Sequence, residues 1–266
     1  MNGIVINIDP VLFRLGDFEL RWYSLAIMLG IIAAVVITSR LAKKKGIDSR
    51  EIQFLAVWVV IGGVVGARLF HVIDHWEHYV NYPQQIIGFQ GLAIWGALIG
   101  GSLALVLYAR IRHLPLRRLV DVVVPGVLVA QIIGRIGCIV NGDAYGGVTN
   151  LPWAFIYTHP DASIPGNLYG LSTHPYPVYE MLWNAMALLV IWRLDRHFKK
   201  DGLIFLSYLG FYSMGRFILT FVRQENQFFW GLQQAQIIAL LAFIISLIAM
   251  VYFTKIRRVP EEVIPG

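Results

Sequence analysis

The chain has 266 residues, of which 57% are hydrophobic and only 14% are charged. Its mean hydropathy is +0.63, whereas roughly 25% of the residues in an average soluble domain are charged. A water-soluble fold of this length could not bury so much apolar surface, so the composition excludes an ordinary soluble protein and indicates a membrane protein. A single cysteine excludes an internal disulfide framework or a cysteine-rich metal site.

Seven apolar stretches are each long enough to cross a hydrocarbon core of about 30 Å. In chain order they are residues 18–40, 52–72, 88–110, 119–141, 176–194, 202–222 and 233–254. Several contain glycines, which allow helices to pack closely in lipid. The sequence therefore predicts an all-α polytopic membrane protein, with seven transmembrane helices in a single integral membrane domain over residues 1–266.

The basic residues predict how these helices are oriented. Sixteen of the 22 lysines and arginines follow the first, third, fifth and seventh stretches, within residues 40–50, 110–118, 193–200 and 255–258. The connections 74–87 and 142–175 contain none. By the positive-inside rule the N-terminus lies outside and the C-terminus in the cytoplasm, and residues 142–175 form a small external, periplasmic-side head between spans 4 and 5. The formal net charge of +6 is then a topology signal, so we expect no nucleic-acid partner.

Six basic residues lie outside the basic loops, and all six are arginines. They are Arg14, Arg21, Arg68, Arg135, Arg216 and Arg223. The first two flank the outer end of the first span, where an interfacial anchor is the simplest interpretation. An arginine inside a span costs on the order of 2.5–3.5 kcal/mol on insertion scales, so it is normally kept for a partner or a ligand.

Three of these arginines are predicted to reach the same depth. Arg68, Arg135 and Arg216 lie 16–18 residues beyond the preceding basic loop, which is about 24–27 Å along a helix. Arg223 follows two turns after Arg216 on the same face. Guanidinium groups match phosphate oxygens and keep their charge when desolvated, so the pattern predicts a site for a lipid phosphate. The alternative is that each arginine snorkels or pairs with a helix carboxylate.

Other polar residues gather at this depth and support the site. They are Tyr23, Gln131, Asn141, Asp143 and Glu180. A second polar group, His71, His75 and His78, has a spacing compatible with zinc, but its interfacial position favours an exposed polar cap. We therefore expect no metal.

The segment Gly134–Gly146, GRIGCIVNGDAYG, resembles the signature of the bacterial phosphatidylglycerol–prolipoprotein diacylglyceryl transferases. Further segments of that family's pattern follow in the expected order, and the resemblance covers residues 17–250. These segments are Arg21-Trp22-Tyr23, Gly66-Ala67-Arg68, the glycine-rich run 91–101, Leu151-Pro152-Trp153-Ala154, His174-Pro175 with Tyr179-Glu180, and Arg216-Phe217-Ile218 with Phe221 and Arg223.

The resemblance implies a transferase that takes no cofactor. Such an enzyme moves the diacylglyceryl group of phosphatidylglycerol to the thiol of the lipobox cysteine in a prolipoprotein signal peptide and releases glycerol 1-phosphate. It is a multi-pass protein of the bacterial cytoplasmic (inner) membrane, surrounded by membrane lipids, with its active site toward the outer leaflet. Lipoprotein biosynthesis is the process to which it belongs.

Roles for individual residues follow from the arginine pattern and the resemblance together. Arg135 and Arg216 are expected to be catalytic by holding the phosphate, Asp143 is the nearest plausible base for the thiol, and Tyr23 a positioning hydroxyl. Residues expected to bind phosphatidylglycerol are Arg135, Arg216, Arg68, Arg223, Asn141, Gly146 and Glu180.

Four positions depart from the family pattern. Trp95 replaces a frequent histidine, Cys138 an asparagine, Asp143 a glutamate, and Thr220 an acid found in many members. Two other functions therefore stay open: a phosphatidylglycerol-binding paralogue without activity, and a lipid transporter. Cys138 could form a covalent intermediate, although a small buried core residue is the favoured interpretation.

Overall fold

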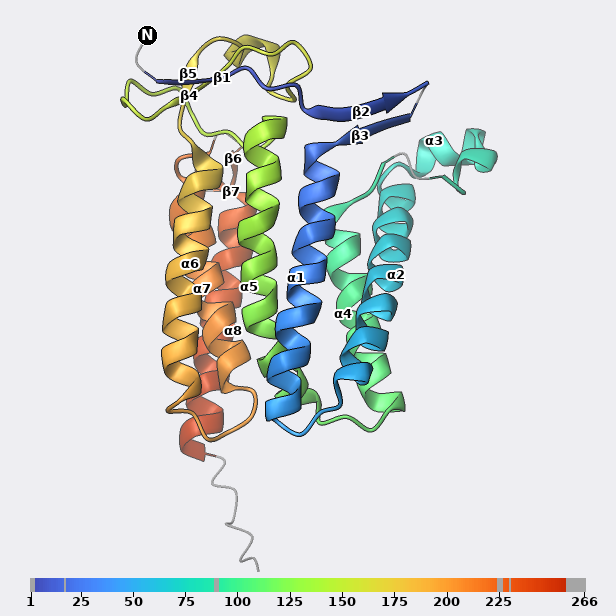
Figure 1. The fold of residues 1–266 in the computed structure, drawn as a ribbon, viewed down its shortest axis with the longest axis vertical. Coiled ribbons are helices and arrows are strands. Elements are labelled where there is room, and N and C mark those ends of the chain that lie inside the picture. The colour runs from blue at the N-terminus through green and yellow to red at the C-terminus, as the bar shows by residue number, and fades with distance from the viewer. Residues whose placement is uncertain (1–2, 17, 89–90, 224–226, 230, 257–266) are drawn as a thin grey trace, which may run out of the picture. The chain divides into compact units, whose positions relative to one another are not determined.

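The fold is described from a computed structural model, which describes residues 3–16, 18–88, 91–223, 227–229 and 231–256 (Figure 1). Its contacts divide into two compact units. Unit 1 comprises Met1–Ala34 with Val123–Gly266, and unit 2 comprises Val35–Val122. Arg257 and Arg258, two of the basic residues expected after the last span, lie outside the described residues.

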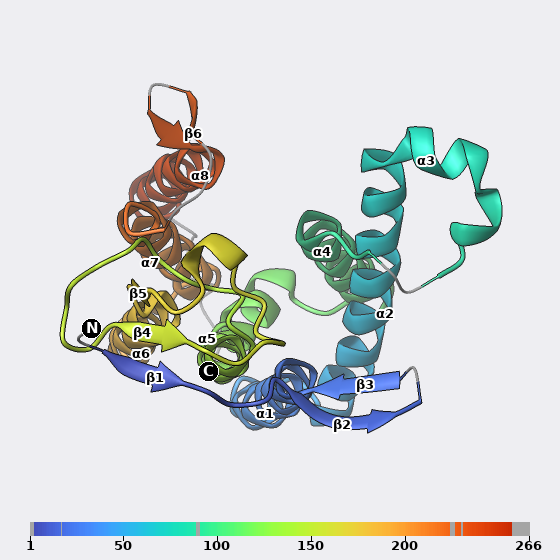
Figure 2. The same ribbon diagram turned by 90° about the horizontal axis from the view of Figure 1, so that it is seen from above.

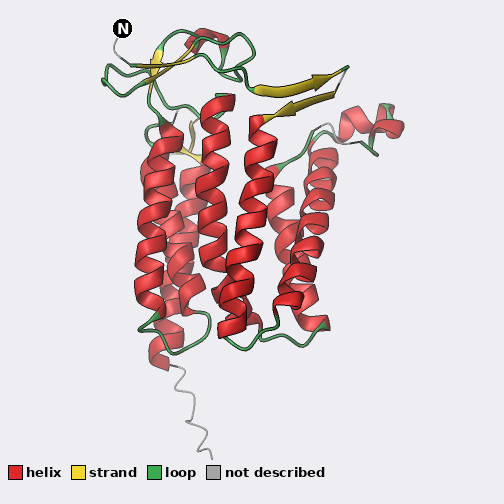
Figure 3. Ribbon diagram, viewed as in Figure 1, coloured by secondary structure: helices red, strands yellow, loops and turns green. Residues whose placement is uncertain are grey.

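Long helices dominate the described chain (Figure 3). They are α1 (Trp22–Lys44), α2 (Ser49–Asp74), α4 (Ile94–Ile111), α5 (Leu116–Asn141), α6 (Tyr176–Asp195), α7 (Leu203–Thr220) and α8 (Gln234–Val251). Short helical segments are α3 (Trp76–Asn81), η1 (Pro83–Gln85), η2 (Gly166–Leu168) and a π-helical turn, η3 (Tyr252–Ile256). Each of the seven predicted stretches overlaps one long helix, so the mainly helical architecture is confirmed.

Six of these helices are long and apolar enough to cross a membrane. The exception is α6, which has 20 residues but carries Glu180 and Asn184 in its first half. Membrane-spanning character is thus supported for six of the seven stretches. The remaining one, the fifth stretch with α6, stays a predicted span.

The predicted start of the first span is wrong by four residues. We expected it at residue 18, but α1 begins at Trp22 because Phe18–Arg21 form a strand, β3. This strand pairs antiparallel with β2 (Val11–Leu15), placing Arg14 opposite Glu19. Opposite charges across a strand pair stabilise that register.

The segment 142–175 folds together with the N-terminal strand at one end of the unit 1 helices (Figure 2). Strand β1 (Ile4–Ile6) runs parallel to β4 (Phe155–Tyr157), which is antiparallel to β5 (Ser172–Thr173). Phe155, Tyr157, Ile164 and Leu168 form a buried cluster against which Ile6, Ile139 and Val178 pack. The segment therefore has its own apolar core, fixed to the ends of α5 and α6.

Two further features complete unit 1. A short hairpin of β6 (Gln227–Phe229) and β7 (Leu232–Gln233) joins α7 to α8. Helices α5, α6 and α7 share a buried cluster formed by Val124, Leu128, Ala187, Ile191 and Ile204. This packing holds the three helices that carry Arg135, Asn141, Glu180 and Arg216.

In unit 2, glycines allow α2 and α4 to approach each other closely. A Cβ atom on Gly66 would lie 2.3 Å from the carbonyl oxygen of Gly96, and one on Gly100 would lie 2.2 Å from that of Gly62. Small residues at such contacts let backbones meet, which is how helices associate in lipid. A buried cluster that includes Leu55, Ala109 and Leu119 continues the packing.

This contact predicts the effect of one added methyl group. Gly66→Ala should lower the free energy of unfolding by about 1–3 kcal/mol, the usual cost of overpacking, because the backbone of α4 must move. Gly63→Ala on the same helix is the matched control, since its Cβ would meet only the carbonyl oxygen of Ala97, at 3.6 Å. Thermal unfolding of the detergent-solubilised variants measures the difference. Equal stability of the two variants would contradict the close contact.

Candidate active site

The centre of the site is one carboxylate shared by two arginines from different helices. Arg135 on α5 places Nη2 2.5 Å from Oε2 of Glu180 on α6. Arg216 on α7 places Nη1 3.2 Å from the other oxygen, Oε1. The Glu180 side chain is buried, whereas Arg135 and Arg216 keep 26% and 20% of their side-chain surface exposed. The structure thus brings together the two arginines on which the predicted chemistry depends.

This arrangement joins two interpretations that the sequence left as alternatives. The guanidinium groups converge, as a phosphate site requires, and they also pair with a helix carboxylate. The second outcome follows from the cost of burying charge: two cations close together in an apolar interior need a nearby anion. Glu180 supplies that anion from the first turns of α6.

Tyr176 also belongs to this cluster, although it was not among the site residues predicted from the sequence. Its hydroxyl accepts a hydrogen bond from Nη1 of Arg216 at 2.7 Å and donates one to Oε1 of Glu180 at 3.1 Å. The guanidinium carbon of Arg223 lies 5.4 Å from the centre of the Tyr176 ring. The i, i+4 spacing of Tyr176 and Glu180 on one helical face was the available signal. Arg223 therefore adjoins the cluster through an aromatic face.

Thr220 lies beside this cluster, but its hydroxyl bonds within its own helix. It donates to the carbonyl oxygen of Arg216 at 2.5 Å. Thr220 is fully buried. The position at which many relatives were expected to carry an acid therefore offers no second carboxylate to Arg216.

Tyr23 and Cys138 lie against the Arg135 side of the site. Cys138, Ala144 and Tyr176 form a buried cluster against which Tyr23 packs. The Cys138 sulfur is 3.6 Å from Nη1 of Arg135, and the residue is 5% exposed. Its burial agrees with the core interpretation of this cysteine.

Asn141 and Asp143 end the arginine-bearing helix. Gly142 takes a left-handed conformation, with φ of 75°, which ends α5 and turns the chain at Asp143. Asn141 Oδ1 accepts a hydrogen bond from Nη1 of Arg21 at 3.3 Å. Arg21 is therefore more than the interfacial anchor that we expected, because it binds the last residue of α5, within the signature segment.

Asp143 has a buried oxygen that lacks a partner among the described residues. Its Oδ1 atom and the hydroxyl of Tyr157 are both buried without a hydrogen bond there. Burial raises the pKa of Tyr157, and the negative charge of Asp143 raises it further. A carboxylate oxygen without a protein partner can accept a proton, and the role of Asp143 as the base stays a prediction.

Gly146 has a packing role in this structure. A Cβ atom there would lie 2.6 Å from Cβ of His174 and 2.9 Å from the carbonyl oxygen of Val222. Its own N–H donates to the carbonyl oxygen of His174 at 3.1 Å. Gly146 thus joins the loop after α5 to the segments around α6 and α7, and its contact with lipid stays a prediction.

Arg68 belongs to unit 2, where its side chain binds backbone carbonyl groups. Nε donates to Ile86 at 2.9 Å, Nη1 to Gly91 at 3.1 Å, and Nη2 to Gln85. Its guanidinium carbon also lies 5.1 Å from the centre of the Tyr79 ring. These contacts indicate that Arg68 fixes the connection between α3 and α4, and its predicted contact with lipid is untested.

The other polar groups that drew attention in the sequence have partners of their own. Nε2 of His78 is 2.9 Å from Oε1 of Gln85, and Nδ1 of His75 is 3.1 Å from the carbonyl oxygen of His71. Gln131 donates to the Tyr208 hydroxyl at 2.9 Å. These contacts indicate a structural role for His75, His78 and Gln131.

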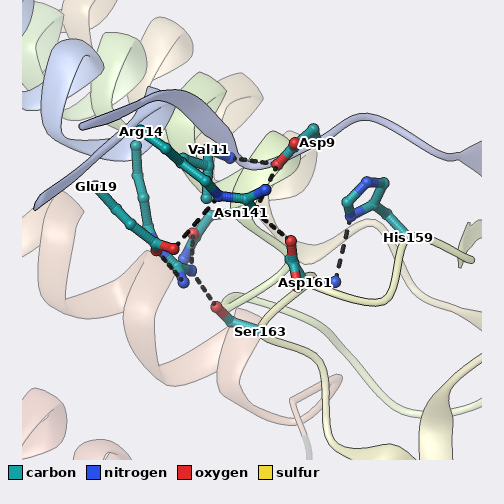
Figure 4. A network of polar contacts seen from close by, with 9 residues as sticks. Asp9, Val11, Arg14, Glu19, Asn141, His159, Asp161 and Ser163 are labelled. Atoms are coloured by element: carbon teal, nitrogen blue, oxygen red, sulfur yellow. Dashed lines mark hydrogen bonds and ion pairs between the residues drawn. The ribbon is translucent and has the colours of Figure 1, made fainter. Parts of the chain in front are cut away.

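Arg14 lies in a separate network at the surface of unit 1 (Figure 4). It pairs with Asp161, with Glu19 at 3.4 Å and with Asp9 at 3.8 Å, and so ties the β2–β3 hairpin to the segment 142–175. Asp9, His159 and Asp161 have ligand atoms within 4.8 Å of one another, a spacing that could hold a metal ion. Because the Arg14 guanidinium already pairs with both carboxylates, we interpret the group as an ion-pair network.

Comparison with known proteins identifies the family of this chain. Residues 10–252 match the family model described as prolipoprotein diacylglyceryl transferase. A phosphatidylglycerol–prolipoprotein diacylglyceryl transferase of Dehalococcoides mccartyi is 34% identical over 97% of this chain and 98% of its own length. Proteins of the same name from Synechococcus elongatus and Clostridioides difficile are 35% and 33% identical, over 97% and 93% of this chain and 92% and 96% of their own. The chain belongs to the prolipoprotein diacylglyceryl transferase family.

Proposed function

We propose that this protein transfers the diacylglyceryl group of phosphatidylglycerol to the lipobox cysteine of prolipoproteins and releases glycerol 1-phosphate. The substrates are those in the names of its relatives, and the reaction class, a transferase, is that of the family. The observation that carries the proposal is the meeting of Arg135 and Arg216 on one carboxylate. Two guanidinium groups that can hold an anion between two helices suit the phosphate of an anionic lipid.

The chemistry is a displacement at the glyceryl carbon that bears the phosphate. The thiolate sulfur forms a bond to this carbon, and the bond from carbon to phosphate oxygen breaks with its electron pair moving to the oxygen. A phosphodiester with one negative charge thereby becomes a phosphomonoester with nearly two. Arg135 and Arg216 stabilise this growing charge, and preorganised cations in a water-poor site are usually the largest catalytic term.

The acceptor thiol must lose its proton before it attacks. A free thiol has a pKa of about 8.5, so a base raises the reactive fraction at neutral pH. Asp143, with its unpartnered buried oxygen, takes this proton in our proposal, and Tyr23 positions the acceptor from the cluster around Cys138. Asn141, Gly146, Glu180, Arg68 and Arg223 complete the set of residues that we expect to bind phosphatidylglycerol, with Arg68 and Arg223 secondary to Arg135 and Arg216.

We place the protein in the bacterial inner membrane as one integral domain with seven spans. The boundaries between the two compact units fall inside the continuous helices α1 and α5, so no linker separates two domains. In this proposal α6 is the fifth of the seven spans, and its Glu180 and Asn184 face other helices, as their burial supports. The positive-inside rule puts the segment 142–175 outside and the active site toward the outer leaflet.

Reconstitution tests the proposed activity. The purified protein is reconstituted in vesicles that contain phosphatidylglycerol labelled in its diacylglyceryl group. A prolipoprotein signal peptide with a lipobox cysteine is then added. Transfer of label to the peptide, with release of glycerol 1-phosphate, supports the proposal. A phosphatidylglycerol-binding paralogue without activity binds lipid and leaves the peptide unlabelled, and a transporter moves lipid between leaflets without forming a thioether.

Substitutions that keep the charge of the arginine pair but change its shape should lower the activity. Arg135→Lys and Arg216→Lys should each lower transfer at least tenfold, because an ammonium group lacks the planar fork that holds two oxygens. Arg193→Lys, an exposed change near the end of α6, is the control and should keep full activity. Rates are compared at equal amounts of protein in the membrane. Full activity in either variant would remove that arginine from the mechanism.

The proposed base predicts a change in pH dependence. Asp143→Asn should reduce transfer at pH 7 but recover toward the wild-type rate as the pH rises through about 8.5, where the thiol ionises without help. Asp74→Asn, an exposed position, serves as the control. The measurement is the initial rate from pH 6.5 to 9.5. The same fractional loss at every pH would exclude Asp143 as the proton acceptor.

Cys138 predicts tolerance to a small change. Cys138→Ser should keep its rate within about threefold of wild type, because the new hydroxyl fits the buried site and can still accept a hydrogen bond from Arg135. The transfer assay compares the rates of the variant and the wild type at a saturating substrate concentration. Complete loss of activity in a folded variant would support a covalent intermediate on Cys138.

A further inference from the structure

Glu180 has a place in the site that the proposed reaction does not itself explain. Its two carboxylate oxygens each contact a different arginine, and these are the two arginines assigned to the substrate phosphate. The residue is 7% exposed, so solvent does little to screen its charge. A protein carboxylate therefore lies between the groups that must bind the lipid anion.

The charges of the cluster indicate what this carboxylate does. Arg135 and Arg216 contribute two positive charges and Glu180 one negative charge, so these three residues together carry one positive charge, and Arg223 lies outside them against the Tyr176 ring. A phosphodiester carries a single negative charge and matches it. The phosphomonoester product carries about −1.5 to −2 at pH 7. Without an internal anion, two buried arginines would hold the product more tightly than the substrate.

The hydrogen bonds give Glu180 an anchor outside the arginine pair. Tyr176, four residues earlier on α6, donates its hydroxyl to Oε1 at 3.1 Å. The carboxylate can therefore lose its contact with Arg135 while one oxygen stays bonded to Tyr176. Oε2, which faces Arg135 at 2.5 Å, is the oxygen that an incoming phosphate replaces.

We propose that Glu180 is an internal competing anion that aligns Arg135 and Arg216 between turnovers and displaces the phosphomonoester product from them. The inference rests on the proposed function, because it assumes that the pair binds the lipid phosphate. Glu180 is a positioning residue in this scheme. It speeds product release at the expense of some affinity for phosphatidylglycerol.

Product inhibition tests the proposal. Glu180→Gln removes the charge and keeps the shape, so the inhibition constant of added glycerol 1-phosphate should fall at least tenfold while kcat decreases and KM for phosphatidylglycerol stays equal or falls. A soluble phosphodiester, glycerophosphoglycerol, should change its inhibition constant less, because it carries one charge. Simple damage to the site would raise both inhibition constants.

Two further variants keep the test decisive. Glu180→Asp retains the charge on a shorter side chain, so its inhibition constant for glycerol 1-phosphate should lie about threefold below wild type and above that of Glu180→Gln. This shift can be measured even if the glutamine variant does not fold. Glu77→Gln, an exposed change in α3, should leave both constants unchanged.

The outcomes separate this inference from the proposed function. Wild-type protein that transfers no diacylglyceryl group contradicts the proposed function. Wild-type protein that is active, with Glu180 variants whose inhibition constant for glycerol 1-phosphate is unchanged or higher, overturns the role of Glu180 alone.

Discussion

The shared salt bridge of Arg135, Glu180 and Arg216 is the interaction on which the rest of the site depends. Three helices of unit 1 each contribute one member, so the packing of α5, α6 and α7 fixes the spacing of the charges. Removing one partner of a buried ion pair leaves an uncompensated charge, which costs about 3–5 kcal/mol. A network of this kind is a weak source of stability and a strong constraint on geometry. It is retained here, in our account, because the reaction needs two cations in one place.

The remaining polar groups surround that network in a consistent way. Tyr176 holds the carboxylate, Arg223 lies against its ring, and Tyr23 packs against the cluster on the Arg135 side. The loop after α5 is held by Gly146 against the segments around α6 and α7. Oδ1 of Asp143, like the hydroxyl of Tyr157, is buried without a hydrogen bond to the described residues. In our proposal the arginines bind the anion and Asp143 accepts the thiol proton, the two functions that a thiol alkylation requires.

Much of the fold followed from the sequence because lipid imposes simple rules. Apolar length located the long helices, and the depth of the unexplained arginines placed Arg135 and Arg216 in one site. The first span was predicted to begin at residue 18, but Phe18–Arg21 contains the charged residues Glu19 and Arg21 and pairs with β2 as a strand. Helix α6 is not among the helices apolar enough to span a membrane. Its polar residue Glu180 lowers its hydropathy and is also the residue that pairs with the two arginines. Hydropathy is therefore least informative where function places charge inside a helix.

Contacts between helices could not be deduced from the sequence. Glu180 was predicted at the depth of the arginines and Arg21 at the outer end of the first span, but their partners depend on which faces of α5, α6 and β3 meet. Arg68 illustrates the limit most clearly. Its depth matched that of the other arginines, yet its guanidinium binds the backbone of the connection between α3 and α4. A guanidinium can satisfy a carbonyl group as well as a phosphate, and the spacing of residues does not distinguish these cases.

The central claim is that Arg135 and Arg216 together bind the phosphate of the lipid. An experimental structure with a non-hydrolysable phosphonate analogue of phosphatidylglycerol tests it most directly. The account predicts that phosphonate oxygens lie within hydrogen-bond distance of both guanidinium groups and that Oε2 of Glu180 has left Arg135. A structure in which the analogue is bound elsewhere, with both arginines still paired to Glu180, would contradict it.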